Sequence, residues 1–414
     1  MWAIPAALFC IAFFHRTAPG TIARELMQSF GVTGAIVGLL SATYYYAYAG
    51  LMVPAGVLLD ASGVPRVVAA GGALMGLGTL VMAAAETTAV LFGGRLLIGL
   101  GASVTFVGAL KIAAAWFPAE RFGTLSATTA TVGTVGGLLA TVPLAALVGV
   151  VGWRPALAAV GVLTLAGAAA CWLVVRDRPD PAPRPSFTEV LRGTRTVLAN
   201  PLTWPPFAAF FFLVAGSSNL WLWTIPFLRD VYGLSTTRAA WYATASSLAV
   251  LIAGPATGFL SDRVLHRRKL PWIVLNVVLL AAWLGLVLTL GRLPLSGLYG
   301  LLFTMGGATS GFVLTWAIGR EVNAPHLAGV AVAVVNVGGF AAAALSQGLV
   351  GWVLDARWQG ATDAGARVYP AEAYAAAFGL CGLFVLASTV ATLFLRETRG
   401  VNVHRAGGDP GSRP

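Results

Sequence analysis

The chain has 414 residues, of which 58% are hydrophobic and only 10% are charged, and its mean hydropathy is +0.82. Soluble domains carry roughly 25% charged residues, so this composition excludes a nuclear, secreted or cytosolic protein. The net charge of +11 would suggest a nucleic-acid partner in a soluble chain, and that interpretation depends on where the charges lie.

Pro, Gly and charged clusters divide the chain into twelve predicted membrane helices, each long enough to cross a bilayer. The first six cover 1–27, 34–60, 66–85, 88–117, 122–150 and 153–175, and the second six cover 203–229, 236–261, 270–291, 295–319, 327–354 and 371–395. We therefore predict an all-α membrane protein with two pseudo-symmetric six-helix bundles, at 1–176 and 201–396. A cytoplasmic linker at 177–200, with a short surface helix at 186–198, joins them, and 397–414 form a cytoplasmic tail.

The first apolar stretch is expected to be a retained membrane helix. It has no basic region before it, and it continues into His15 and Arg16 instead of a small-residue cleavage site. Cys10, Cys171 and Cys381 lie far apart in apolar runs, so neither a disulfide framework nor a thiolate metal site is predicted. No cofactor is expected.

The basic residues indicate how the helices are oriented, because Lys and Arg beside short loops are retained on the cytoplasmic face. With both termini placed inside, seventeen of the 26 basic residues are cytoplasmic, seven lie on the outer side of the membrane, and two lie within spans. The two are Arg16 and Arg95, and the seven are Arg24, Arg154, Arg229, Arg238, Arg292, Arg357 and Arg367. We therefore predict a multi-pass protein of the cytoplasmic membrane, and the basic excess requires no nucleic acid.

One sequence pattern, G-x-L-x-D, occurs at the inner end of both the second and the eighth predicted helix. The two copies are 202 residues apart, close to half the chain, as expected for an internally duplicated transporter. The copies are Gly56, Leu58 and Asp60, followed by Gly63 and Arg66, and Gly258, Leu260 and Asp262, followed by Arg263, Arg267, Arg268 and Lys269.

These loops resemble the loop motif of the major facilitator superfamily, and the resemblance covers essentially the whole chain. In that family the Asp lies against the positive N-terminal end of a helix in the opposite bundle. The resemblance implies that Asp60 faces the start of the eleventh helix, near His326, and Asp262 the start of the fifth, near Arg121. Such contacts would hold the cytoplasmic side closed, although both loops could simply form turns. The implied gating residues are Asp60, Arg66, Asp262 and Arg263.

Ionisable residues within the spans are the main functional candidates, because a central charge costs about 2.5 to 3.5 kcal/mol even on a lenient scale. No Asp or Glu is placed mid-span, whereas His15, Arg16 and Arg95 are. A cationic cavity without counter-charges should prefer an anion.

Arg16 lies near the middle of the first helix, where the chain resembles the organophosphate antiporters and anion:cation symporters of the superfamily. In those branches a first-helix Arg contacts the negative group of the substrate, and a guanidinium fork suits carboxylate or phosphate. The alternative is an Arg that reaches the interface or bonds backbone carbonyls.

Arg95 and His15 are candidates for both substrate contact and coupling. Arg95 begins R-x-x-x-G-x-G with Gly99 and Gly101, which resembles a fourth-helix motif of many proton-coupled members, although a purely structural role is equally open. His15 has an ordinary pKa near 6.5 and could carry a proton, but a lone His beside Arg is more often a packing residue.

Further polar residues are predicted to line the cavity. Tyr44 and Tyr48 share one face of the second helix, although they could also form a packing patch. The seventh helix is expected to be interrupted at Gly216 to Asn219, with a gating bend. Asn219 and Trp221 would contact substrate there, and Asn336 would contribute from the eleventh helix unless it only bonds a neighbouring helix.

The predicted function is secondary transport of a small organic anion by a monomeric carrier, coupled to protons or a counter-anion. Export or import of a drug, amphiphile or siderophore is the first alternative, and a non-transporting membrane sensor is the second. An enzyme is not predicted, because no nucleophile, metal set or acid–base pair gathers in one region.

Overall fold

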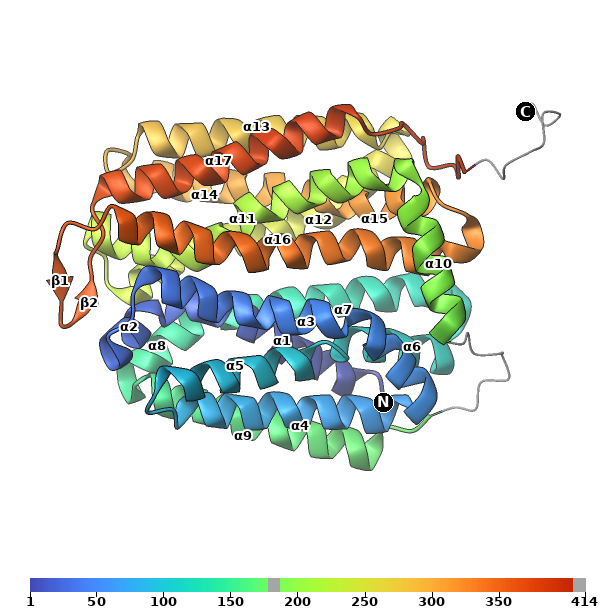
Figure 1. Ribbon diagram of the computed structural model, residues 1–414, viewed down its shortest axis with the longest axis horizontal. Helices are drawn as coiled ribbons and strands as arrows, with labels where there is room; N and C mark the ends of the chain where they lie inside the picture. The colour runs from blue at the N-terminus through green and yellow to red at the C-terminus, as the bar shows by residue number, and fades with distance from the viewer. Residues whose placement is uncertain (178–186, 405–414) are drawn as a thin grey trace.

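The computed structural model describes residues 1–177 and 187–404, which form an almost entirely helical protein (Figure 1). Each long apolar run of the first half has become a helix or a broken pair of helices. They are α1 (Ala3–Thr21), α2 (Ala23–Phe30), α3 (Gly34–Ser62), α4 (Val64–Ala83), α5 (Thr88–Ala102), α6 (Thr105–Trp116), α7 (Ala119–Leu139), α8 (Val142–Val151) and α9 (Trp153–Val174).

The second half begins with the expected surface helix, α10 (Phe187–Ala199), and ends with α17 (Ala371–Leu393). A two-stranded hairpin of β1 (Thr362–Asp363) and β2 (Ala366–Arg367) lies between the last two long helices. The remaining elements are α11 (Trp204–Tyr232), α12 (Thr236–Phe259), a π-helical turn (Leu260–Leu265), α13 (Lys269–Leu288), α14 (Leu295–Ala308), α15 (Phe312–Glu321) and α16 (Ala328–Ala356), with short 3-10 turns at Pro201–Thr203, Thr309–Gly311 and Pro325–Leu327.

Within the described residues, eleven helical segments are long and apolar enough to cross a membrane, and the bent pair α1–α2 makes a twelfth. The 64° bend between α1 and α2 at Ile22 follows Pro19, which removes a backbone donor from the helix. The predicted fold class and span order are confirmed, so the chain is an integral multi-pass membrane protein.

One expectation about the helices is wrong. The seventh membrane helix is not interrupted at Gly216 to Asn219, because α11 is continuous from Trp204 to Tyr232. Tertiary packing explains the difference: a Cβ on Gly216 would lie 2.7 Å from the carbonyl oxygen of Cys381, so α17 packs directly against this turn. The Asn219 side chain also donates to the carbonyl of Ala215 and stays within the helix.

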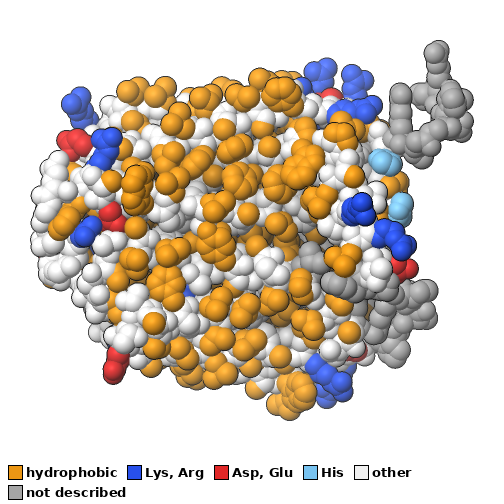
Figure 2. All heavy atoms as spheres, viewed as in Figure 1, with side chains coloured by type: hydrophobic (Ala, Val, Ile, Leu, Met, Phe, Trp, Pro, Cys, Tyr) orange, Lys and Arg blue, Asp and Glu red, His pale blue; other side chains and the backbone are white. Residues whose placement is uncertain are grey.

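Helices α1–α9 form one group and α11–α17 the other, and the two groups lie side by side (Figure 1). The hairpin and α2 lie at one end of the molecule, called the hairpin end below. Helix α10, the N-terminus and the end of the described chain lie toward the opposite end, called the linker end (Figure 1). A broad band of apolar side chains covers the face between the two ends, where few charges appear (Figure 2), as expected for a surface in contact with lipid.

The two groups touch most closely along α3 and α16, which run in opposite directions. A Cβ on Gly38 would lie 2.2 Å from the carbonyl oxygen of Gln347, and a Cβ on Gly351 would lie 2.3 Å from that of Gly34. Toward the linker end, added Cβ atoms on Gly56 of α3 and on Gly329 of α16 would meet nothing within 4 Å. The bundles are therefore in backbone contact at the hairpin end.

Candidate functional site

Arg16 of α1 lies where the two bundles meet, and aromatic rings surround its guanidinium. Five ring centroids lie between 4.1 and 5.9 Å from Cζ, within the roughly 6 Å over which a cation is attracted to a ring face. We call these residues the aromatic cage: Phe13 of α1, Tyr44, Tyr45 and Tyr48 of α3, and Phe340 of α16.

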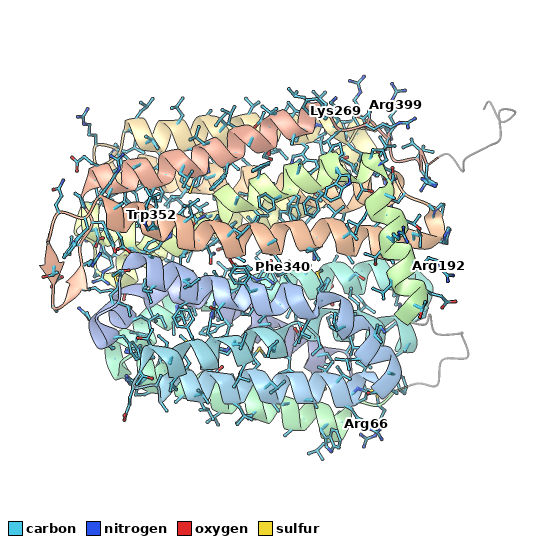
Figure 3. All side chains as sticks on the ribbon, viewed as in Figure 1. Arg66, Arg192, Lys269, Phe340, Trp352 and Arg399 are labelled. Carbon is cyan, nitrogen blue, oxygen red and sulfur yellow. The ribbon has the colours of Figure 1, made fainter. Side chains whose placement is uncertain are left out.

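Phe340 is the cage residue that the second bundle contributes. It lies near the middle of α16, at the boundary between the bundles (Figure 3). Its ring stacks on Tyr48 with centroids 4.4 Å apart and an interplanar angle of 1°. The guanidinium is therefore enclosed by side chains from both halves of the chain.

The Arg16 guanidinium carries an unused hydrogen-bond donor. Its Nε is buried without an acceptor, and no described carboxylate lies within 4 Å of the side chain. A buried donor without a partner costs about 1–3 kcal/mol, and more when it is charged. The arrangement is chemically suited to binding an acceptor that brings its own negative charge.

Arg95 of α5 lies inside the first bundle and is only 1% exposed. One of its terminal nitrogens donates to the backbone carbonyl of His15 at 2.7 Å, while its Nε and other terminal nitrogen have no acceptor among the described residues. Its Cζ lies 5.1 Å from the Tyr44 ring, which also faces Arg16. Arg95 thus holds the backbone next to Arg16 but does not itself reach the bundle interface.

His15 is buried against the third membrane helix. Its Nε2 lies 3.0 Å from the hydroxyl oxygen of Thr79, and the whole residue is 2% exposed. The structure therefore places His15 on the side of α1 that packs within the first bundle, away from the aromatic cage, and its predicted roles in substrate contact and coupling stay predictions.

The predicted residues of the second bundle are dispersed. Asn219 is fully buried and donates to the Ser346 hydroxyl on α16 at 3.2 Å, and the Trp221 indole donates to Ser247 on α12. Asn336 of α16 accepts from the Trp316 indole at 3.3 Å, and its amide nitrogen lies 3.9 Å from the Met52 sulfur of α3. The Asn336 side chain therefore contacts the opposite bundle.

A carboxylate from the second bundle closes the hairpin end. The Asp355 carboxylate accepts from the backbone N–H groups of Gly34 and Ala35, at 3.0 and 2.7 Å, and so caps the start of α3. Tyr369 donates to Asp355 at 2.6 Å and accepts from the Gly34 N–H at 2.8 Å. Burial, reinforced by Asp355, raises the pKa of Tyr369, so its hydroxyl keeps the proton that it donates.

The predicted gating residues of the linker end do not meet across the bundles in the parts that the structure describes. Asp262 forms an ion pair with Arg268, whose guanidinium also lies 3.0 Å from Glu321 of its own bundle. Arg66 and Arg263 are exposed. The side chain of Asp60 lies outside the described part, so its contact with the opposite bundle stays a prediction, as does that of Asp262 with Arg121.

The residues that follow the last membrane helix form hydrogen bonds with this same network. Both oxygens of Glu397 accept from the backbone, from the N–H of Arg268 at 2.8 Å and that of Lys269 at 3.2 Å. Farther along, the Val403 N–H donates to the carbonyl of Glu321 at 2.7 Å. Residues after α17 therefore form part of the second bundle.

Two features of the site were not predicted from the sequence. Phe340, Tyr45 and Phe13 complete the cage, but single aromatic residues in apolar helices carry no signal of their own. The contact between α3 and α16 does have a signal, because Gly34 and Gly38 form a small-residue pair four apart, a spacing typical of helices that pack closely in membranes. No three His, Cys, Asp or Glu in the described part gather closely enough to bind a metal.

Comparisons with known proteins identify the family and the fold of the chain. The family model described as Major Facilitator Superfamily matches residues 6–347. The chain is 22% identical over 274 residues to the probable sulfoacetate transporter SauU of Cupriavidus necator, covering 63% of this chain and 64% of that protein, less than two thirds of its length. It is 24% identical to a putative tartrate transporter of Agrobacterium vitis, covering 84% and 82% of the two chains.

A solved structure shares the fold. It is a bacterial homologue of the human lysosomal transporter Spinster, described as inward-facing and occupied, with a TM-score of 0.79 at 17% identity over 95% of this chain and 96% of that one. Identity at this level supports the fold alone.

Proposed function

Because this chain belongs to the major facilitator superfamily, we propose that it is a secondary active transporter of a small organic anion, a carboxylate or a phosphate-bearing metabolite. One observation carries the proposal: the Arg16 guanidinium lies at the bundle interface, in an aromatic cage, with a buried donor and no acidic partner among the described residues. An anionic solute would supply the missing acceptor.

The surroundings of Arg16 favour an anion over a cation or a neutral solute. A guanidinium offers five donors in a planar fork that matches carboxylate or phosphate. Burial strengthens the attraction, because the effective dielectric constant there is far below that of water. The rings of Tyr45 and Tyr48 belong to the same cage, and a tyrosine hydroxyl can donate a hydrogen bond to an anion. The names of the relatives, a sulfoacetate and a tartrate transporter, support the same class.

Transport would proceed by alternating access. The bundles are in backbone contact at the hairpin end, through Gly38 and Gly351, so this state would be open toward the linker end. Basic side chains mark that end, including Arg66, Arg192, Lys269 and Arg399 (Figure 3), and basic loops are retained in the cytoplasm. We place both termini in the cytoplasm and the hairpin end outside, with the carrier acting as a monomer coupled to protons or a counter-anion.

Uptake into reconstituted proteoliposomes tests the proposal. Sulfoacetate, tartrate and inorganic phosphate would be compared with a cationic drug and a neutral amphiphile, using wild type, Arg16→Gln and Arg16→Lys. We expect at least one anion to be transported, Arg16→Gln to abolish that transport, and Arg16→Lys to restore part of it. The exposed Arg292 supplies a matched control, Arg292→Gln, with unchanged transport.

Three outcomes would contradict the proposal. Full transport of the anion by Arg16→Gln would refute the anion site. Transport of the drug or amphiphile alone would identify the chain as an exporter or importer of such compounds. Movement of no solute, despite folded protein, would favour a membrane sensor.

A further inference from the structure

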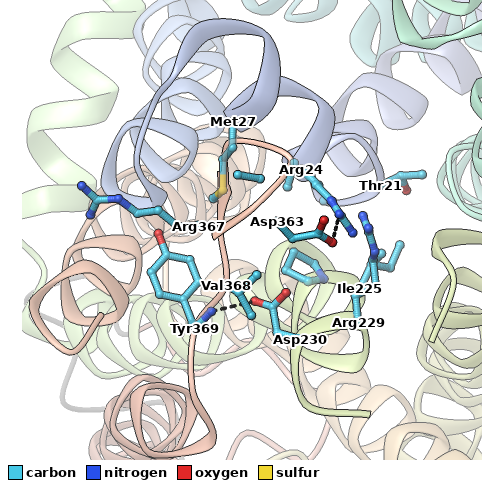
Figure 4. Close-up of a pocket in the computed structure, with 14 residues that line it drawn as sticks. Thr21, Arg24, Met27, Ile225, Arg229, Asp230, Asp363, Arg367, Val368 and Tyr369 are labelled. Carbon is cyan, nitrogen blue, oxygen red and sulfur yellow. Dashed lines mark hydrogen bonds and ion pairs between the residues drawn. The ribbon is translucent and has the colours of Figure 1, made fainter. Parts of the chain in front are cut away.

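A second cavity lies at the hairpin end, apart from the aromatic cage (Figure 4). Its volume is about 120 Å³, whereas one water needs roughly 10–15 Å³ of such space, so a small anion fits. Its walls come from both bundles: the junction of α1 and α2, the end of α11, and the hairpin. Gly20 lines it on the first-bundle side, one helical turn beyond Arg16, where an added Cβ would lie 2.4 Å from the Trp221 carbonyl oxygen.

Three guanidiniums and two carboxylates line the cavity, and all but one of these groups have charged or hydrogen-bonding partners among the described residues. Arg24 pairs with Asp363. Arg367 lies 3.1 Å from Asp355, outside the lining. The Asp230 carboxylate accepts from the Tyr374 hydroxyl at 2.8 Å and from the Tyr369 N–H at 3.2 Å.

Arg229 is the remaining group. Its Nε is buried without an acceptor, and the described residues place no carboxylate within ion-pair distance of its side chain. Arg229 is therefore the one guanidinium of the cavity without an ion-pair partner among the described residues. Arg24 and Arg229 come from opposite bundles, and both line the same small space (Figure 4).

We propose that this cavity is a second anion-binding site, in which Arg24 and Arg229 bind the carboxylate or phosphate group of a solute at the hairpin end. This inference rests on the proposed function, because the solute is of the class that Arg16 binds. In the closed state the Asp363 carboxylate occupies Arg24 and takes the place of the solute's negative group.

The position of Asp363 explains how the site becomes available. Asp363 belongs to the hairpin of the second bundle, whereas Arg24 belongs to the first, so separation of the bundles at this end breaks their pair. The pair is also weakly held, because its side chains are 30% and 56% exposed and exposed ion pairs contribute little stability. An incoming anion therefore competes with Asp363 for Arg24 and finds Arg229 already unpaired.

The experiment uses the purified full chain and two anions, tartrate and sulfoacetate, measured by calorimetric titration. In the Arg16→Gln background, which removes the central site, we expect weaker but measurable binding. Adding Arg229→Gln should weaken this residual binding at least tenfold, Arg229→Lys should restore part of it, and Asp363→Asn should strengthen it several-fold. Arg238→Gln, at an exposed position of the same end, is the matched control and should change nothing.

Transport from each side gives a second readout. In oriented vesicles, Arg229→Gln should raise the apparent KM five- to tenfold for anion added at the hairpin side and leave the KM from the linker side unchanged. Loss of all binding in Arg16→Gln, or an unchanged residual affinity in Arg229→Gln, overturns the second site while the proposed function stands. Failure of wild type to bind or move either anion overturns both.

Discussion

Arg16 and Arg95 are both buried arginines of the first bundle, and both contact the ring of Tyr44, yet their surroundings differ. Arg16 lies at the bundle interface and contacts Phe340 of the opposite bundle. Arg95 is enclosed within one bundle and bonds the backbone of His15, the residue before Arg16. Under the proposed function, location relative to the interface, more than burial, would distinguish a residue that contacts solute from one that positions it.

A double-mutant cycle provides the strongest test of this comparison. Loss of a buried charge partner costs about 2–5 kcal/mol, so Arg16→Gln should weaken anion binding at least roughly thirtyfold. Arg95→Gln should weaken it roughly tenfold, the loss expected from one charge-assisted hydrogen bond. If Arg95 acts through Arg16, the second substitution should change little once the first is present. Calorimetric titration measures all four proteins, and additive losses would show that Arg95 contacts the anion independently.

A substitution at the bundle interface should affect the cage but not the surroundings of Arg95. Gly38→Ala places a methyl group against the carbonyl of Gln347, and such overpacking costs about 1–3 kcal/mol. The hairpin-end-closed state should therefore lose population by roughly 5- to 150-fold. Cysteine accessibility at this end measures the shift. Gly56→Ala, where an added Cβ meets nothing within 4 Å, should behave as wild type, and equal accessibility in both variants would contradict the prediction.

A smaller effect is expected from the ring that the second bundle contributes. Phe340→Leu removes one cation–π contact and one stacked pair, and each is worth about 0.5–1.5 kcal/mol. Because the other four rings of the cage belong to the first bundle and remain, we expect a two- to tenfold loss in anion affinity, measured by uptake kinetics. Phe259→Leu, at a 65% exposed position, is the control. A loss as large as that of Arg16→Gln would mean that Phe340 contacts the solute directly.

The smallest effect is expected at His15. Its ring bonds Thr79 inside the first bundle, and Asn retains a hydrogen-bonding group at this position. We expect His15→Asn to leave the pH profile of anion uptake unchanged within about twofold, as for a packing residue. Loss of the pH dependence would instead assign proton coupling to His15 and place a function on the side of α1 that faces away from the cage.

The fold was largely predictable from the sequence because membrane helices are specified by length and apolarity. The predicted span at 371–395 corresponds to α17 at Ala371–Leu393. Breaks inside spans were not predicted, since Ser103 and Val104, between α5 and α6, lie within an otherwise continuous apolar run. The bend at Ile22 could have been predicted, because Pro19 precedes it.

The candidate site was predictable only in part. Buried charges are conspicuous in apolar helices, so Arg16 and Arg95 could be identified directly. Which side of a helix faces the other bundle depends on packing between distant segments. The sequence therefore did not show that Arg16 faces the other bundle whereas His15 packs within its own. The pairing of Arg24 with Asp363 joins residues 339 positions apart, and no local pattern reports such a contact.

The attachment of Glu397 to the start of α13 has a practical consequence for truncated or tagged versions of this protein. A truncation before Glu397 would leave the backbone donors of Arg268 and Lys269 without their acceptors and would remove the strand-like contact of Val403 with Glu321. Affinity tags and fluorescent fusions are therefore best attached beyond His404, and shorter versions are expected to give lower yields of folded protein.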